Sequence, residues 1–203
     1  MGCEEGYTEE NGSCVVEESC KAVGDILYND LNCYTTAPSG KTAIGVVFDT
    51  TNKLAIGLTY KHGYEWGGYG TDITTMTNYT SSSAALADTT SGKTNTSRIV
   101  AALGSGTSYA AGYCYNLTTG GLAKGSWFLP SVKELYTVYN NKSTINTAIT
   151  NAGGSTISSN YYWCSLEYSS SIAWRLDMSD GYVGYYDKDG YNTSHYVRCA
   201  VAY

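Results

Sequence analysis

The chain has 203 residues, a formal net charge of -6 and a sequence pI near 4.8, with only 15% charged residues. Because it contains no run of Lys or Arg, it has no source for the phosphate neutralisation that drives nucleic-acid binding, and we expect no nucleic-acid partner. No apolar stretch approaches the roughly 18 to 20 residues of a membrane span. Only 34 residues are Leu, Ile, Val or Phe, whereas 21 are Tyr and 4 are Trp, so aromatic rings must supply much of the core.

Four of the seven cysteines fall within the first 33 residues, where hydrophobic periodicity is poor. The seven are Cys3, Cys14, Cys20, Cys33, Cys114, Cys164 and Cys199. Without Cys-x-x-Cys pairs or nearby His, this spacing favours disulfides over zinc, and disulfides indicate an extracellular, cell-surface, periplasmic or virion location. A reduced cytosolic protein with scattered buried thiols is the alternative. Seven is odd, so at least one thiol is free or pairs with another chain.

The cysteine distribution divides the chain into two expected units. Residues 1–38 are expected to form a cysteine-rich disulfide module or tether, and residues 39–203 a ligand-binding domain. Gly6 stands where the myristoylation pattern requires Ser or Thr, so Met-Gly-Cys is interpreted as an added start before a mature segment. A lipid or protein tether at the N-terminus is left open.

The first half of the larger unit combines a hairpin, a long loop and short helices. Residues 42–48 and 54–60 are β-rich and flank Asp49-Thr50-Thr51-Asn52, which predicts a hairpin. Glycine and threonine dominate residues 63–92, which predicts a long ordered loop without a helix. Helical periodicity then follows in residues 99–103, up to Gly104, and in residues 109–117.

The second half begins with the clearest local signal in the chain. Ser131 with Glu134 three residues on predicts a helix that starts with a capping box. Another helix is expected over residues 144–151. The pattern then changes to period two, which predicts strands over residues 173–179 and 182–187 around an Asp180-Gly181 turn, and a last strand over residues 196–201.

The segment from Ala110 to Tyr203 resembles bacterial C-type-lectin-fold domains. Its Trp127-Phe128-Leu129-Pro130-Ser131 followed by Glu134-Leu135 is similar to the family's Trp-Arg-Leu-Pro-Thr and Glu-Leu signature. Further similarity lies in Ala111-Gly112-Tyr113-Cys114-Tyr115-Asn116-Leu117, Tyr162-Trp163-Cys164-Ser165-Leu166-Glu167-Tyr168, Ala173-Trp174, Asp180-Gly181-Tyr182-Val183 and Tyr196-Val197-Arg198-Cys199. The chain departs from the family at Phe128, Cys164 and Leu166. Related proteins include lectin-like adhesins, formylglycine-generating enzymes and the variable proteins of diversity-generating retroelements.

This resemblance implies an α+β C-type lectin fold, in which small antiparallel sheets are flanked by helices and long loops. It also implies that the helix near residue 110 packs beside the last strand and that Cys114 and Cys199 form a disulfide. Cys164 would then pair with the N-terminal module or remain free.

Enzymatic and metal-binding functions are disfavoured by the residues available. His62 and His195 lie in neither a Ser-His-Asp nor a Cys-His context, and Glu167 is interpreted as a hydrogen-bonded structural residue. The carboxylates around Asp187 and Asp189 lack the later Glu of an EF-hand loop, so a solvated turn is preferred to a calcium site. We therefore expect no enzyme, no cofactor and no metal.

A binding surface made by the last third of the chain is the favoured function. Nine Tyr between Tyr161 and Tyr203 alternate with Ser, Gly, Asn and Asp, as in antibody paratopes, although some must fill the core. Carried over from retroelement variable proteins, the exposed ligand-binding candidates are Arg175, Asp177, Tyr182, Gly184, Tyr186, Asp187, Asp189, Tyr191, Asn192, Thr193, Ser194 and His195. An invariant bacterial or phage adhesin that binds a carbohydrate or protein is the alternative, and a formylglycine-generating-type oxidase is third.

Overall fold

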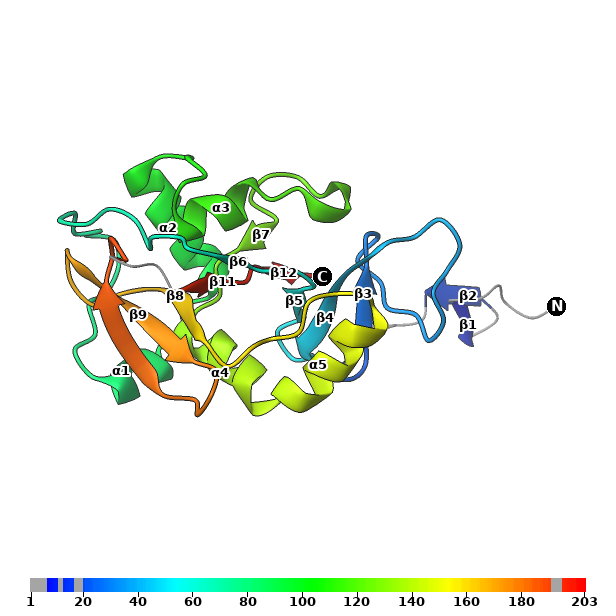
Figure 1. The fold of residues 1–203 in the computed structure, drawn as a ribbon. Helices are drawn as coiled ribbons and strands as arrows, with labels where there is room; N and C mark the ends of the chain where they lie inside the picture. The colour runs from blue at the N-terminus through cyan, green and yellow to red at the C-terminus, as the bar shows by residue number, and fades with distance from the viewer. Residues whose placement is uncertain (1–6, 11–12, 17–19, 191–194) are drawn as a thin grey trace.

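Five α-helices and three β-sheets lie within residues 7–10, 13–16, 20–190 and 195–203, which the computed structural model of the chain describes (Figure 1). The first sheet is a separate hairpin of β1 (Tyr7–Glu10) and β2 (Ser13–Val16). It lies at the N-terminal end of the molecule, beyond β3 (Figure 1). The other two sheets have five strands each and lie among the helices, so the described chain is a mixed α+β structure.

The β4 sheet has the strand order β3-β4-β5-β12-β7. Its strands are β3 (Ile26–Tyr28), β4 (Ala43–Asp49), β5 (Leu54–Gly57), β12 (Ala200–Ala202) and β7 (Trp127–Phe128). The predicted hairpin is confirmed as β4 and β5, and Asp49 closes its turn by accepting the Thr51 and Asn52 N–H groups, each at 2.9 Å. Because β3 pairs with β4, part of the cysteine-rich segment joins this sheet.

The β8 sheet has the strand order β10-β9-β8-β11-β6. Its strands are β10 (Val183–Asp187), β9 (Ile172–Asp177), β8 (Tyr161–Glu167), β11 (Tyr196–Val197) and β6 (Lys61–His62). The strands β8, β9 and β10 form an antiparallel meander, whereas β11 pairs with β8 in parallel. The predicted turn between β9 and β10 is confirmed.

The helices precede the meander in the chain. They are α1 (Ser82–Ala87), α2 (Gly92–Leu103), α3 (Ala110–Asn116), α4 (Val132–Asn140) and α5 (Lys142–Asn151), with a 3-10 turn at Thr119–Gly121. The predicted capping box begins α4: Ser131 Oγ accepts the Glu134 N–H at 3.2 Å, and Glu134 Oε2 accepts the Ser131 N–H at 2.8 Å. Glu134 also accepts the Gly92 N–H that begins α2, at 3.1 Å. One buried carboxylate therefore fixes the start of two helices.

Two expectations about elements are wrong. Residues 63–92 contain a helix, α1, because Ser81 caps the Ala84 N–H at 3.3 Å and Ala85 is buried. The last strand is also divided, between β11 in one sheet and β12 in the other. The division falls at Arg198, whose buried guanidinium donates to the carbonyls of Gly57 and Leu58 at 2.8 Å each. Burial lowers the pKa of Arg198 to about 10.

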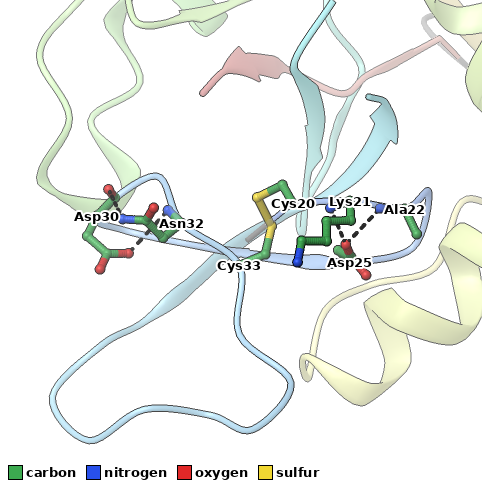
Figure 2. Close-up of a disulfide and its surroundings, with 7 residues drawn as sticks. All are labelled: Cys20, Lys21, Ala22, Asp25, Asp30, Asn32 and Cys33. Atoms are coloured by element: carbon green, nitrogen blue, oxygen red, sulfur yellow. Dashed lines mark hydrogen bonds between the residues drawn. A yellow bond between two sulfur atoms is a disulfide. The ribbon is translucent and has the colours of Figure 1, made fainter. Parts of the chain in front are cut away.

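Two disulfides connect segments that are distant in the sequence. Cys114 in α3 is bonded to Cys199, 85 residues later, as the resemblance implied. Cys20 is bonded to Cys33, which ties the entry to β3 to the residues that follow it (Figure 2). Nearby, Asp25 accepts the N–H groups of Lys21 and Ala22 at 2.8 and 2.9 Å (Figure 2). Among the described cysteines, Cys164 is buried and unbonded.

Tryptophan supplies the bulk that the aliphatic-poor sequence lacks. All four tryptophans, Trp66, Trp127, Trp163 and Trp174, are at most 1% exposed. Two of their indole N–H groups donate to distant backbone carbonyls, from Trp66 to Cys164 at 2.8 Å and from Trp163 to Tyr64 at 2.9 Å. Loop 63–70 is thereby fastened to β8, which provides a rigid base for the meander.

Candidate functional site

The meander brings most of the described candidate residues to one face of the β8 sheet. Trp163, Arg175 and Gly184 are aligned across β8, β9 and β10, and Tyr161 is aligned with Asp177. Directly paired residues point to the same side of a sheet, and so do residues two apart along a strand. We call the surface formed by these residues, together with Tyr182, Tyr186 and His195, the Arg175 face.

Arg175 lies at the centre of an aromatic cluster on this face. Its guanidinium carbon is 3.9 Å from the ring centroid of Tyr161 and 4.7 Å from that of Tyr186. Its Nη1 lies 2.8 Å from Nε2 of His195. Cation–π contacts of this kind hold a guanidinium in place while leaving its charge available. Burial lowers the pKa of Arg175, but the neighbouring phenol rings oppose this effect.

His195 forms the base of the cluster and is 2% exposed, so the expectation that it is an exposed ligand residue is wrong. Its ring stacks on Trp163, with 4.1 Å between centroids and 14° between the planes. Burial, followed by the charge of Arg175, lowers the pKa of His195 to about 4. The ring is therefore neutral at physiological pH, and its Nε2 accepts the hydrogen bond from Arg175.

Gly184 is also buried, contrary to the expectation of exposure. A Cβ atom there would lie 2.7 Å from Cε1 of Tyr182, so the Tyr182 ring covers this glycine. Tyr182 itself is 62% exposed and Tyr186 is 39% exposed. The glycine thus lets the Tyr182 ring lie close against the strand beside Arg175.

The remaining candidates differ in their environments. Asp187 is exposed at the end of β10, and Asp189 is half-buried. Asp177 closes the β9–β10 turn, because its Oδ1 accepts the Ser179 N–H at 2.8 Å and the Ser179 hydroxyl at 2.6 Å. Tyr191, Asn192, Thr193 and Ser194 lie outside the described residues.

Sequence reasoning missed Tyr185, which is 49% exposed on the opposite face of β10. Its ring lies 4.7 Å from Tyr168 and 5.7 Å from Trp174, measured between centroids. β10 is the edge strand of the sheet, and part of this face is uncovered there. The available signal was the pair of adjacent tyrosines, Tyr185 and Tyr186. Successive strand residues point to opposite faces of a sheet, so the two rings had to lie on different faces of β10.

Two other groups considered from the sequence lie elsewhere. Glu167 is fully buried and forms an ion pair with Lys188, so its carboxylate is not exposed to a ligand. His62 is an exposed residue of β6 whose ring packs near Tyr196. Within the described ranges, no group of three or more His, Cys, Asp and Glu side chains could hold a metal ion.

A polar groove of about 460 Å³ on another part of the molecule is a rival site. It lies where α2 and α4 begin, beside the β4–β5 turn. Its lining includes Asp49, Asp88, Lys93, Lys133 and Glu134. These carboxylates are largely used within the fold: Asp49 closes a turn, Asp88 accepts from Thr90, and Glu134 fixes two helix starts.

Comparison with known proteins identifies the family. Residues 71–201 match the model of the Lcl C-terminal domain, and the chain belongs to this family. The fold is similar to the crystal structure of a fimbrial protein from Bacteroides ovatus ATCC 8483, with a TM-score of 0.69 and 16% sequence identity. The similarity covers 90% of this chain but 49% of the fimbrial protein, so the chain spans about half the length of that protein. No curated protein matches the chain. In the described part of the chain, none of the helices is long and apolar enough to cross a membrane.

Proposed function

We propose that this chain is a secreted or surface-displayed, adhesin-like domain that binds a protein or glycan through the Arg175 face, without catalysis. The two disulfides support an oxidising location. Membership of the Lcl C-terminal domain family and the fold similarity to a fimbrial protein agree with a role at the cell surface.

The arrangement of Arg175 between two tyrosine rings carries this proposal. Arg175 is in β9, and its guanidinium contacts Tyr161 of β8 on one side and Tyr186 of β10 on the other. The ring of Tyr182 is exposed beside them. Tyr and Arg are enriched at binding hot spots. Tyr combines a large contact area with hydrogen bonding and loses little conformational entropy. All four side chains come from paired strands or the turn between them, so the face is ordered before a ligand arrives.

A ligand screen with matched variants tests the proposal. The wild-type chain is applied to a glycan array and to a panel of extracellular proteins, together with Arg175→Ala, Tyr182→Ala and Tyr186→Ala. The control is Tyr69→Ala, which removes a ring of similar exposure, 57%, from a loop outside the meander. We expect each face variant to weaken binding at least tenfold, the effect of about 1.4 kcal/mol, while the control binds normally. Equal binding by all variants would refute the Arg175 face as the site.

A finer part of the proposal is that the chain has C-type lectin topology and belongs to the retroelement-diversified variable proteins. Supporting it, Arg175, Asp177, Tyr182 and Tyr186 lie on one face, between the buried positions Trp174, Leu176 and Val183. A scaffold of this kind tolerates replacement of the four residues on the face while the buried residues keep their packing. Deep sequencing of the gene across its source population should show substitutions concentrated at these four face positions. An equal substitution density at all codons would indicate an invariant adhesin.

The disulfide at Cys114 supports the non-catalytic part of the proposal. Cys114 and Cys199 are bonded to each other and buried, so neither offers a thiolate for thiol-dependent oxidation. Burial also raises the pKa of the Cys164 thiol far above its ordinary value, which makes it a poor nucleophile. An assay of cysteine-containing peptides for oxidation to formylglycine should therefore detect no product, and product formation would overturn this part.

A further inference from the structure

A fully buried pair, Lys188 and Glu167, connects the end of β8 with the residue that follows β10 and has no role in the proposed recognition. Both side chains are completely shielded from solvent, and Lys188 Nζ contacts Glu167 Oε2. The amine also donates to the Thr71 carbonyl at 2.8 Å and lies 4.8 Å from the Trp66 ring centroid. The other carboxylate oxygen, Oε1, accepts the Ile73 N–H at 3.0 Å. Burying two charges in this way carries a desolvation penalty that ion pairing offsets only in part.

We propose that Lys188 and Glu167 condense to an intramolecular isopeptide bond that closes a covalent ring around the β9–β10 hairpin. The Lys188 Nζ–Glu167 Cδ bond forms and the Cδ–Oε2 bond breaks. One water leaves, made of Oε2 and two protons from the ammonium group. No oxidant, reductant or cofactor is needed, because an ammonium and a carboxylate together contain the atoms of one amide and one water.

The neighbouring groups fit each stage of this reaction. The Ile73 N–H is placed to stabilise negative charge on Oε1 in the tetrahedral intermediate, as an oxyanion hole does. The Asp72 carboxyl interacts with both Glu167 and Lys188, so it is placed to carry a proton from the amine to the leaving oxygen. After condensation, the amide N–H can still donate to the Thr71 carbonyl, and Oε1 can still accept from Ile73.

Burial also favours the forms of the two groups that react. It raises the pKa of Glu167 and lowers the pKa of Lys188, so both groups are shifted toward their neutral states. A neutral amine next to a neutral carboxylic acid in a fixed site reacts with a high effective concentration. The product is an uncharged amide, which removes the desolvation penalty of the buried ions.

The mass of the folded chain tests the proposal directly. The wild-type chain is unfolded, its disulfides are reduced and alkylated, and its intact mass is measured. We expect a mass lower by one water than that of the sequence with its cysteines alkylated. After trypsin digestion, we expect fragment 143–175, which contains Glu167, to be linked to fragment 176–198, with no cleavage at Lys188.

Variants separate this bond from other dehydrations. Lys188→Arg and Glu167→Ala should have their full sequence masses, and Asp72→Asn should be dehydrated in a smaller fraction or more slowly. Lys41→Arg, which replaces the amine of the exposed Lys41–Asp30 ion pair, should still lose one water. A wild-type chain that is folded by circular dichroism but has its full mass would overturn the proposal. Water loss that persists in Lys188→Arg, or that maps to a succinimide at Asp180-Gly181 or Asp189-Gly190, would also overturn it.

Discussion

Arg175 and His195 depend on each other for their environments. Arg175 donates to the neutral His195 ring, and that ring is held flat against Trp163 from the neighbouring strand. A protonated His195 would lose its acceptor atom and place a second positive charge next to the guanidinium. Acid therefore acts against the very contact that orients Arg175.

We predict that this contact makes stability depend on pH between about 6.5 and 4. The pKa of His195 is about 4 in the folded chain and close to 6.5 when unfolded, so the unfolded chain binds more protons in this window. The free energy of unfolding should consequently fall as the pH is lowered, by up to about 1.4 kcal/mol per pH unit for one proton. Urea unfolding at several pH values should show a shallower dependence in His195→Gln. The exposed-residue control, His62→Gln, should follow the wild type, and identical curves for all three would contradict the prediction.

Gly184 gives a second prediction at this scale. Gly184→Ala places a methyl group against the Tyr182 ring, which is exposed and can rotate away. We expect the free energy of unfolding to change by less than about 1 kcal/mol, whereas ligand affinity falls as in Tyr182→Ala. Unchanged affinity for the ligand found by the screen would show that the position of this ring is unimportant.

The sequence predicted the outward positions of β9 better than the surroundings of individual residues. Period two alone separates Arg175 and Asp177 from Trp174 and Leu176, and the structure has that alternation. His195 could not be placed in this way, because its burial depends on stacking with Trp163, which is 32 positions away in the sequence. Such a contact exists only once the parallel pairing of β11 with β8 has formed.

Among the elements, α4 was predictable because its signal is local, whereas sheet membership was not. Ser131 and Glu134 are three residues apart, and both halves of the capping box are present. The division of the last strand instead reflects Arg198 bonding to carbonyls about 140 residues earlier. The boundary predicted at residue 38 stays a prediction, although β3 attaches residues 26–28 to the β4 sheet.

The shared role of Glu134 predicts a clear order of helix variants. Ser131→Ala removes one cap and should lower the free energy of unfolding by about 1 kcal/mol. Glu134→Ala leaves the N–H groups of Gly92 and Ser131 without their buried acceptor, and should lower it by about 2 to 4 kcal/mol. Chemical denaturation of both variants checks this order. Equal losses would mean that Glu134 does not hold the start of α2.

At the scale of the whole molecule, the two described disulfides should contribute unequally. Cys114–Cys199 closes a loop of 85 residues and Cys20–Cys33 one of 13. The chain-entropy model gives about 4.5 kcal/mol for the first and about 3 kcal/mol for the second. Paired Cys→Ala variants, compared by their denaturation midpoints, should therefore rank in this order. A larger loss from the shorter loop would show that local packing around Cys20 outweighs loop length.

The measurement that most directly tests recognition by the Arg175 face is hydrogen–deuterium exchange with and without the ligand from the screen. We predict slower exchange in peptides that span β9 and β10, residues 172–187, and in the start of β8. Exchange around the polar groove at residues 49–54 and 88–93 should not change. Protection of that groove, with unchanged exchange in the meander, would contradict recognition by the Arg175 face and assign ligand binding to the start of α2 and α4.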